Sequence, residues 1–341
     1  MSGSETPLPL ALTMGEPAGI GAEITLKAWL SRGDALPPFF LLDDPDRLRA
    51  LAAQLSLDAP IAVIDSPRDA TAAFGRGLPV LPLRLPRPAK SGLPDPANAP
   101  AVIESIKRAV ALCMRGEAAA VVTNSIQKKT LYEAGFEHPG HTEYLAELGG
   151  GMKPAMMLVG ASLRVVPVTI HVSLRTALDG LSTAVIVATG RIVAEALARD
   201  FGVARPRIAV AGLNPHAGEE GALGREDIDI VAPAVTALRN AGIEATGPLP
   251  PDTMFHAAAR AHYDAALCMY HDQALIPLKT LAFDTGVNVT LGLPFVRTSP
   301  DHGTALNIAG KGVANPASLI EAIKLAGSMA RHRAQRARVR A

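Results

Sequence analysis

The sequence predicts a soluble α/β protein, and three observations support this fold class. The chain has 341 residues, which is long enough to bury a large core and to divide into two domains or lobes. Hydrophobic residues make up 48% of it and aromatic residues only 4%, so small aliphatic side chains must fill the interior. Apolar runs of strand length alternate with helical patterns along the chain. We therefore expect helices packed against a buried sheet.

Charge and hydropathy exclude several classes of partner. The formal net charge is +1, so no charged field marks the chain for nucleic acid or for an anionic membrane. Met1–Pro9 lack a basic segment followed by an apolar one, and no later apolar run reaches membrane-spanning length without a charge or a proline. Cys113 and Cys268 are too few and too far apart for a disulfide framework or a cysteine zinc site, and we expect both in the core. These features favour a cytoplasmic protein with no nucleic-acid or membrane partner.

The first third of the chain begins with a strand that turns into a helix. Residues 8–14 form an apolar strand, and the turn Gly15–Gly21 leads into a helix over 22–31. Glycine-rich turns often hold phosphates, but this one lacks the spacing of the dinucleotide fingerprint and of the P-loop, and Glu16 would repel an anion. Residues 82–100 are rich in proline and lack a period, which predicts an exposed excursion. The other elements expected here are strands at 39–42, 61–64, 80–83 and 119–123 and helices at 46–54 and 101–115.

Polar residues follow the strand at 119–123. The tract Asn124–Lys129 lies where open α/β sheets bind ligands, although a capped helix with solvated lysines explains it equally well. In the turn Gly140–Glu143, Thr142 is a candidate cap for a helix that ends near Leu148, but capping does not explain His141. The remaining elements expected before residue 271 are helices at 173–178, 183–200, 226–240 and 252–261 and strands at 165–170, 207–213 and 265–270.

Three histidines stand at the ends of expected strands and suggest a metal site. They are His171, His216 and His271. Three imidazoles with open positions suit a Lewis-acid metal, because substrate oxygens must enter its coordination sphere. Asp252 and Asp272 are candidate acceptors that fix the imidazole tautomers. Taken singly, however, each histidine is more often a surface or hydrogen-bonded residue.

The segment from residue 270 to 315 is dense in polar groups. Lys279 and Arg297 supply positive charge for an anionic substrate or are surface charges, and Asn288 offers a donor and an acceptor. A buried loop with so many unpaired donors would be costly, so these groups either face water or converge on a polar ligand.

The tract Asp301–Pro316 resembles the loop with which isopropylmalate and isocitrate dehydrogenases hold the adenosine end of their nicotinamide cofactor. That family does not use the dinucleotide fingerprint, so its absence here is no objection. A wider set of motifs, in order from about residue 10 to residue 325, resembles the family of 4-hydroxythreonine-4-phosphate dehydrogenases, PdxA. These motifs are residues 14–21, 140–143, 212–219, 247–250 with 252–253, 269–273 and 286–299.

The resemblance implies two α/β/α lobes with a cleft between them, as in isocitrate and isopropylmalate dehydrogenases. Residues 1–128 and 280–341 would form the lobe with the cofactor loop, and residues 129–279 the lobe with the metal ligands and the dimer contacts. The family's metal ligands match His171, His216 and His271. Its substrate contacts match His141, Thr142, Lys279, Asn288 and Arg297. The cofactor loop would place His302, Gly303, Thr304, Asn307 and Asn315 against NAD or NADP.

The resemblance also implies a reaction. The secondary alcohol of 4-phosphooxy-L-threonine is oxidised by NAD(P), and loss of carbon dioxide gives 3-amino-2-oxopropyl phosphate, in the biosynthesis of pyridoxal 5'-phosphate (vitamin B6). A divalent ion would act as Lewis acid in both steps. Three imidazoles favour zinc, with magnesium or cobalt as alternatives. Asp252, Asp272 and Lys279 are the candidate proton acceptors.

Two departures from the family pattern keep other substrates open. Asn124-Ser125 replaces the usual Gly-Pro, and Ala274 replaces a usual Gly. Relatives that oxidise 4-phosphothreonate, 4-phosphoerythronate or a terephthalate dihydrodiol share the same motifs. A metal-dependent hydrolase would also use three histidines but would not need the adenosine loop, and a non-catalytic binding protein would form no NADH.

We expect a homodimer with the active site at its interface, with His171 and His216 from one chain and His271 from the other.

Overall fold

The computed structural model describes residues 7–33 and 36–340, and these form two compact α/β units. The first unit contains the chain up to residue 153 together with 293–330, and the second contains 154–292 together with the end of the chain from 331. The lobes expected from the sequence divide at residues 128 and 279. The division after residue 153 assigns His141 and Thr142 to the first unit, and the division after residue 292 assigns Asn288 to the second.

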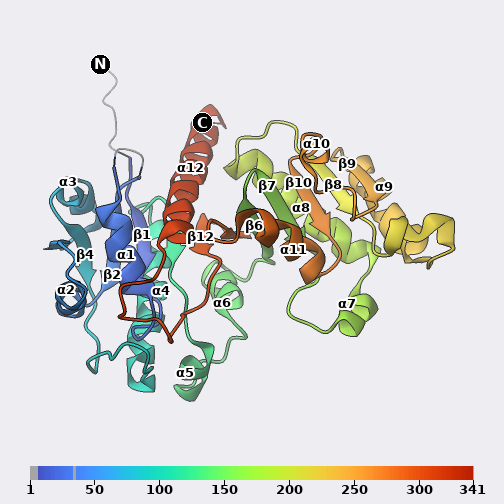
Figure 1. Cartoon of the computed structure of the whole chain (residues 1–341). Helices are drawn as coiled ribbons and strands as arrows, with labels where there is room; N and C mark the ends of the chain where they lie inside the picture. The colour runs from blue at the N-terminus through green and yellow to red at the C-terminus, as the bar shows by residue number, and fades with distance from the viewer. Residues whose placement is uncertain (1–6, 34–35, 341) are drawn as a thin grey trace. The chain divides into compact units, whose positions relative to one another are not determined.

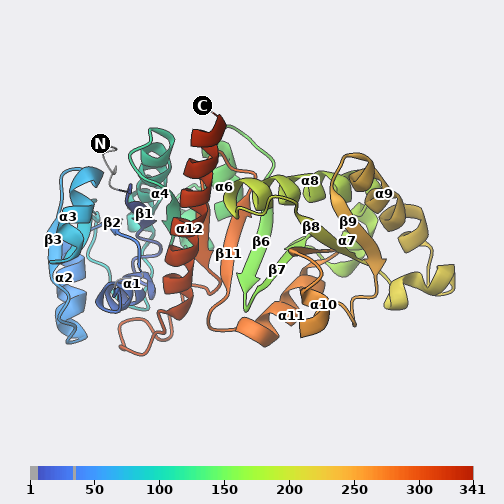
Figure 2. The same cartoon turned by 90° about the horizontal axis from the view of Figure 1, so that it is seen from above.

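The first unit is built on a parallel sheet in the order β3-β4-β2-β1-β5-β12, with helices along it (Figure 1). Figure 2 shows α1 and α4 on opposite sides of β1 and β2. Residues 39–42 of β2 are fully buried, so both faces of this strand are covered, as expected for the interior of a parallel sheet. The strands are β1 (Leu10–Thr13), β2 (Phe39–Asp43), β3 (Ile61–Val63), β4 (Leu78–Pro82), β5 (Val121–Thr123) and β12 (Arg297–Pro300). The helices are α1 (Gly21–Leu30), α2 (Pro45–Gln54), α3 (Ala70–Phe74), α4 (Ala99–Met114), α5 (Lys128–Glu133) and α6 (His141–Leu148), with 3-10 turns at Pro67–Asp69 and Pro96–Asn98.

The second unit has a mixed sheet in the order β11-β6-β7-β10-β8-β9. β6 pairs antiparallel with β11 and β7, and the pairs from β7 to β9 are parallel. The strands are β6 (Ala155–Gly160), β7 (Leu163–Pro167), β8 (Arg207–Ala211), β9 (Glu244–Leu249), β10 (Ala265–Cys268) and β11 (Val287–Leu291). The helices are α7 (Leu174–Gly180), α8 (Thr183–Asp200), α9 (Ala232–Asn240), α10 (Ala257–Arg260) and α11 (His271–Ala282), with η3 at Pro215–Gly221 and η4 at Asp227–Val231. The last helix is α12 (Ala317–Arg340).

The hairpin of β6 and β7 closes on a strained pair of residues. Ala161 and Ser162 have φ angles of 46° and 64°. Two successive left-handed residues are characteristic of the type I′ turn, which matches the twist of the strands but favours Asn-Gly. The chain therefore makes this turn without the residues that usually accommodate it.

Several expected elements differ in the structure. The helix expected over 252–261 is wrong for most of its length, because only Ala257–Arg260 is helical. Met254 is instead buried in the core of the second unit, where its carbonyl accepts a hydrogen bond from the Tyr263 hydroxyl at 2.8 Å. His271 does not end a strand but begins α11. Cys268 is buried as expected, whereas Cys113 is only half-buried.

Within the described residues, no single helix is both long and apolar enough to cross a membrane. By length and composition alone, α7 and α8 pass that test as a pair, but they are bent by 92° from one another.

Candidate functional site

Two of the three candidate metal ligands lie side by side in the second unit. β7 and β10 are neighbouring parallel strands, so the residues that follow them reach the same edge of the sheet. The ring centres of His171 and His271 are 5.6 Å apart. Zinc–nitrogen bonds of about 2.0–2.1 Å place two imidazole ring centres roughly 5 Å apart in a tetrahedral site, so this pair fits two ligands of one ion. The rings line a hollow of about 170 Å³ with Thr169, Tyr270 and Asp272.

Asp272 orients one of these rings. His271 is the first residue of α11, and Asp272 follows it in the first turn. The Nδ1 atom of His271 and the Oδ1 atom of Asp272 are 2.7 Å apart. A carboxylate at this distance favours a proton on Nδ1 and leaves the lone pair of Nε2 available to a ligand. Asp252, the other expected acceptor, is exposed and has no hydrogen bond or ion pair among the described residues.

Two of the candidate ligands have strained backbones. His171 has a φ of 53° and His216 a φ of 52°. His216 also begins a left-handed stretch that runs to Glu220, with φ between 44° and 82°. Left-handed geometry costs roughly 1–2 kcal/mol for each residue with a side chain. Strain of this kind is characteristic of ligand-binding segments whose surroundings enforce it.

The carboxylate of Asp227 holds the chain just before this left-handed stretch. Asp227 is 1% exposed and accepts hydrogen bonds from the backbone nitrogens of Leu213 at 2.7 Å and Asn214 at 3.0 Å. Gly218 is packed closely against it, because an added Cβ there would lie 3.3 Å from the Asp227 carboxylate. Neither Asp227 nor the left-handed stretch was foreseen from the sequence.

The described residues contain no group of three side chains able to hold a metal ion. His171 and His271 are neighbours, and His216 does not complete their site. From the sequence we expected His171 and His216 to act together, with His271 from a second chain. Within the single chain, the ring of His171 lies beside that of His271, and the distribution of the three ligands between two chains stays a prediction.

An imidazole and a buried guanidinium interact electrostatically in the first unit. Arg297, the first residue of β12, is 4% exposed and donates from Nε and Nη2 to the Thr123 hydroxyl at 3.2 and 2.6 Å. Burial lowers the pKa of Arg297 to about 10, so the side chain is still a cation at neutral pH. Burial, reinforced by the charges of Arg297 and Lys128, lowers the pKa of His141 well below its usual 6.5. His141 is therefore neutral at pH 7 and can donate a hydrogen bond to a phosphate or carboxylate.

Thr142 does not cap α6 as expected. The helix begins at His141, its N-cap is Gly140, and this N-cap makes no side-chain hydrogen bond. The hydroxyl of Thr142 is therefore not used for capping, and it lies on the turn that carries His141.

Unsatisfied polar atoms coincide with several of the residues named from the sequence. His141 Nε2, Asn288 Oδ1 and His302 Nε2 are buried and have no hydrogen-bond partner among the described residues. Each such atom costs about 1–3 kcal/mol unless water or a ligand satisfies it. Lys279 lies on α11, with its Nζ atom 5.7 Å from the centre of the Phe283 ring. The orphaned atoms are where a polar ligand would form new hydrogen bonds.

The expected cofactor loop, residues 302–315, packs against the turn Gly15–Gly21 that follows β1. Its His302 carbonyl accepts from the Ser125 hydroxyl at 2.5 Å, and its Thr304 carbonyl accepts from the Ile20 nitrogen at 3.1 Å. Further along, the Gly310 carbonyl accepts from Gln54 Nε2 at 3.0 Å. These contacts hold the segment at both ends and leave Gly303 and Asn307 exposed between them.

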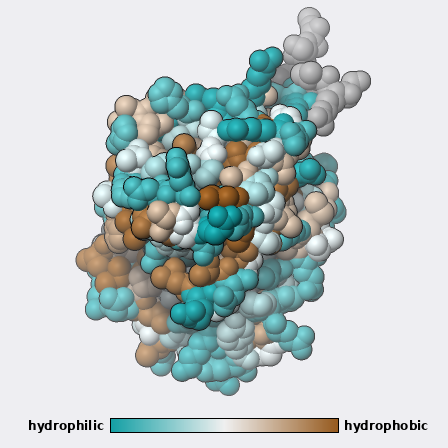
Figure 3. Space-filling model, turned by 90° about the vertical axis from the view of Figure 1, so that its right-hand side faces the viewer, coloured by the Kyte–Doolittle hydropathy of each residue, from teal (hydrophilic) through white to brown (hydrophobic). Residues whose placement is uncertain are grey.

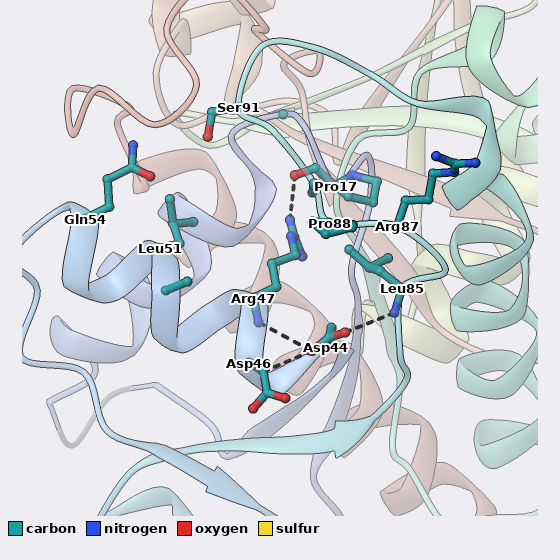
Figure 4. Close-up of a pocket in the computed structure, with 13 residues that line it drawn as sticks. Pro17, Asp44, Asp46, Arg47, Leu51, Gln54, Leu85, Arg87, Pro88 and Ser91 are labelled. Carbon is teal, nitrogen blue, oxygen red and sulfur yellow. Dashed lines mark hydrogen bonds between the residues drawn. The ribbon is translucent and has the colours of Figure 1, made fainter.

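Figure 4 shows a cavity in the first unit that is lined by Pro17, Leu51, Gln54 and Ser91 among others. Its volume is about 360 Å³. Its polar groups are largely occupied: Arg47 donates to the Pro17 carbonyl, and Gln54 donates to Gly310. The cavity therefore borders the expected cofactor loop but has few groups available for specific recognition.

Three residues have structural contacts that the sequence did not reveal. Asn315 Oδ1 accepts a hydrogen bond from the Ala317 nitrogen and so holds the start of α12. The Asn124 Nδ2 atom donates to the Thr13 carbonyl at 3.0 Å and to the Thr25 hydroxyl at 3.1 Å. Ser125 binds the carbonyl of His302, as described above. The Asn124-Ser125 departure from the family pattern therefore ties β1, α1 and the cofactor loop together.

These features define an α/β protein with two neighbouring histidine rings in one unit and an interacting imidazole and guanidinium in the other. The family model described as "Pyridoxal phosphate biosynthetic protein PdxA" matches residues 35–326. The 4-hydroxythreonine-4-phosphate dehydrogenase of Bradyrhizobium diazoefficiens is 58% identical over 94% of this chain and 97% of that protein. The chain belongs to the PdxA family, which confirms the resemblance found in the sequence.

Solved structures agree with this assignment. The 4-hydroxythreonine-4-phosphate dehydrogenase of Klebsiella pneumoniae superposes with a TM-score of 0.86 at 41% identity, over 94% of this chain and 99% of that one. A terephthalate 1,2-cis-dihydrodiol dehydrogenase from Burkholderia xenovorans gives a TM-score of 0.65 at 28% identity, over 95% of this chain and 98% of that one. The chain is therefore more similar to the first of these two enzymes.

Proposed function

We propose that the chain is a 4-hydroxythreonine-4-phosphate dehydrogenase that depends on NAD or NADP and on a divalent metal ion. It would oxidise 4-phosphooxy-L-threonine and release carbon dioxide to give 3-amino-2-oxopropyl phosphate, a step toward pyridoxal 5'-phosphate. The observation that carries this proposal is the 58% identity, over nearly the whole of both chains, to a relative with that name. The terephthalate diol alternative is less favoured, because a solved relative with that name is 28% identical, compared with 58% for the dehydrogenase above.

The residues of the first unit bind the anionic end of the substrate in this proposal. Arg297 is fixed by its two hydrogen bonds to Thr123, so its guanidinium needs little reorganisation when a phosphate or carboxylate arrives. His141 is neutral, and its unsatisfied Nε2 donates to the same anion. Thr142 adds a hydroxyl from the same turn. A neutral imidazole beside a buried cation adds a hydrogen-bond donor without the like-charge repulsion that a second cation would cause before an anion binds.

Asn288 and the histidine pair act on the remaining part of the substrate. The buried Oδ1 atom of Asn288 accepts a hydrogen bond from a substrate hydroxyl or amine. Asp272 keeps a proton on Nδ1 of His271 and so presents Nε2 as a ligand. When bound, a divalent ion held by the histidines would supply Lewis-acid chemistry, and a nicotinamide cofactor would supply the hydride acceptor. Because Asp272 is already bonded to His271, Asp252 and Lys279 are the stronger candidates for accepting the hydroxyl proton.

We further propose that the enzyme is a homodimer whose active site is shared. One chain supplies the neighbouring His171 and His271, and the third imidazole is His216 of the partner subunit. Large apolar side chains near the histidine pair are exposed in the single chain: Val172, Leu174, Leu178 and Ile276. Figure 3 shows brown hydrophobic surface among hydrophilic surface on one face of the molecule. Exposed apolar side chains beside an incomplete site favour burial against a second copy.

The test is the formation of NADH or NADPH with a panel of substrates. The purified protein is assayed with 4-phosphooxy-L-threonine, 4-phosphothreonate, 4-phosphoerythronate and the terephthalate dihydrodiol, each with NAD and with NADP. The proposal expects the highest kcat/KM for 4-phosphooxy-L-threonine, loss of turnover after exhaustive chelation, and recovery on adding zinc, magnesium or cobalt. A preference for another substrate would assign the chain to that branch of the family. Full activity without metal would refute the Lewis-acid role.

A further inference from the structure

A charged pair on the first helix is bonded to a segment almost three hundred residues away. Glu23 and Lys27 lie one turn apart on α1, with Lys27 Nζ 2.9 Å from Glu23 Oε1. The Glu23 carboxylate is fully buried, and 18% of the Lys27 side chain is exposed. Burying a carboxylate is costly even when it is paired, so a pair in this position calls for an explanation beyond the strength of the ion pair.

The pair holds both polar groups of two residues in the 302–315 segment. Lys27 Nζ donates to the carbonyls of Gly312 and Ala314, each at 2.8 Å. Glu23 accepts from the nitrogen of Ala314 at 2.9 Å and from that of Gly312 at 3.4 Å. The two side chains thus bind this stretch of backbone much as a neighbouring strand would. In Figure 2 the red-brown segment that precedes α12 passes beside α1.

Packing alone provides little restraint at this point in the segment. Lys311 and Gly312 are exposed, and 66% of Val313 is exposed. Gly312 is in the left-handed region with a φ of 74°. Because the surrounding side chains face solvent, the conformation of this stretch depends chiefly on its hydrogen bonds to the charged pair. Ala314 is the exception, since it is 2% exposed.

We infer that Glu23 and Lys27 are positioning residues that set the conformation of the cofactor-binding segment 302–315. The segment is held at its start by Ser125 and Ile20 and near its end by Gln54 and the charged pair. The exposed Asn307 lies between these two anchor points. Loss of the second anchor would let the cofactor-binding stretch adopt many conformations, and NAD would have to select one of them. This inference rests on the proposed function, because it takes the segment to be the NAD site.

The experiment compares variants of the pair with a matched control on α12. Lys27→Met removes the two hydrogen bonds to the carbonyls, and the double variant with Glu23→Gln also removes the buried charge, in case the single variant unfolds. Lys27→Arg keeps a cation and should restore the wild-type behaviour. The control is Lys324→Met, which breaks the exposed ion pair of Lys324 with Glu321 at 2.8 Å.

Two readouts are needed, and the first does not depend on activity. Hydrogen exchange without ligand should be faster in the peptide that covers 303–316 in the Lys27→Met and double variants, by about tenfold or more at the amide of Ala314. The dissociation constant for NAD should rise about tenfold or more in the same variants, with KM for the phosphorylated substrate nearly unchanged. The control should change neither quantity.

The outcomes separate the inference from the proposed function. Unchanged exchange in both pair variants, or faster exchange with unchanged NAD affinity, would overturn the positioning role while leaving the enzyme's function intact. A wild-type protein that binds no NAD would instead refute the assignment of the segment as the cofactor site, and this inference would fall with it. Equal losses for NAD and for substrate would point to general destabilisation rather than positioning.

Discussion

Mixing two inactive variants should restore activity if His216 comes from the partner subunit. His171 and His271 lie together in one chain, with ring centres 5.6 Å apart, and no third ligand joins them among the described residues. In a symmetric dimer each site then contains two histidines from one chain and one from the other. His171→Ala and His216→Ala homodimers should both be nearly inactive, because each leaves two ligands at every site.

The recovery can be calculated from this arrangement. In a mixed dimer of His171→Ala and His216→Ala chains, one site collects both substitutions and the other has all three histidines. Random exchange of equal amounts makes about half of the dimers mixed, and half of their sites are intact, so activity should return to about a quarter of the wild-type value. The measurement is NADH formation before and after subunit exchange, with mass spectrometry to count mixed dimers.

A second mixture provides the control. His171→Ala with His271→Ala should stay inactive, because both substitutions fall on the same half of each site and no site in the mixed dimer is complete. Recovery in this second mixture but not in the first would refute the pairing of His171 with His271 and favour the arrangement first expected from the sequence. No recovery in either mixture, with exchange verified, would mean that a single chain supplies all three ligands.

Further predictions concern His141, Arg297 and the hairpin. The pKa of His141 is lowered in the folded state, so below about pH 6.5 the unfolded chain binds a proton that the native chain does not. The free energy of unfolding should therefore fall as the pH falls, by up to about 1.4 kcal/mol per pH unit, until the lowered pKa is reached. Urea titrations of His141→Asn should show a shallower decline, and an identical slope would contradict this. Arg297→Lys should raise KM for the phosphorylated substrate about tenfold or more with KM for NAD unchanged, because an ammonium cannot bond both Thr123 and the anion as a guanidinium does. Replacing Ala161-Ser162 by Asn-Gly should raise the free energy of unfolding by about 1 kcal/mol without changing kcat, because both positions are left-handed and Asn-Gly adopts that conformation at lower cost. A lower melting temperature in thermal melts would contradict the inference that this turn is strained.

The regular elements could be predicted where hydrophobic period and capping agree. The helix expected over 183–200 has those bounds in the structure, and the Ser182 hydroxyl caps it. β6 was missed because its hairpin turn is Ala161-Ser162, which carries no glycine or asparagine signal. α11 was missed because Pro277 lies inside it, and a proline is a strong signal against a helix interior.

The site was predicted less completely, because strand pairing brings its parts together. His171 and His271 are a hundred residues apart in sequence, and they meet because Val166 of β7 pairs with Leu267 of β10. A single sequence shows which residues end a strand but not which strand lies beside it. The left-handed stretch at His216 follows Leu213, which bonds to the carboxylate of Asp227, and its Gly218 packs against the same carboxylate; no periodicity or capping pattern in the sequence reveals these contacts.

The first unit contains both early and late parts of the chain, and this sets an order for its folding during synthesis. Its strand β12 pairs with β5 through Arg297 and Val121. Lys27 donates to the carbonyl of Gly312, which lies 285 residues further along the chain. The strands of the second unit all lie between residues 155 and 291, so that unit has its whole sheet before β12 leaves the ribosome. The unit that begins first is therefore completed last, and the nascent chain exposes the edge of β5 while the second unit is being made.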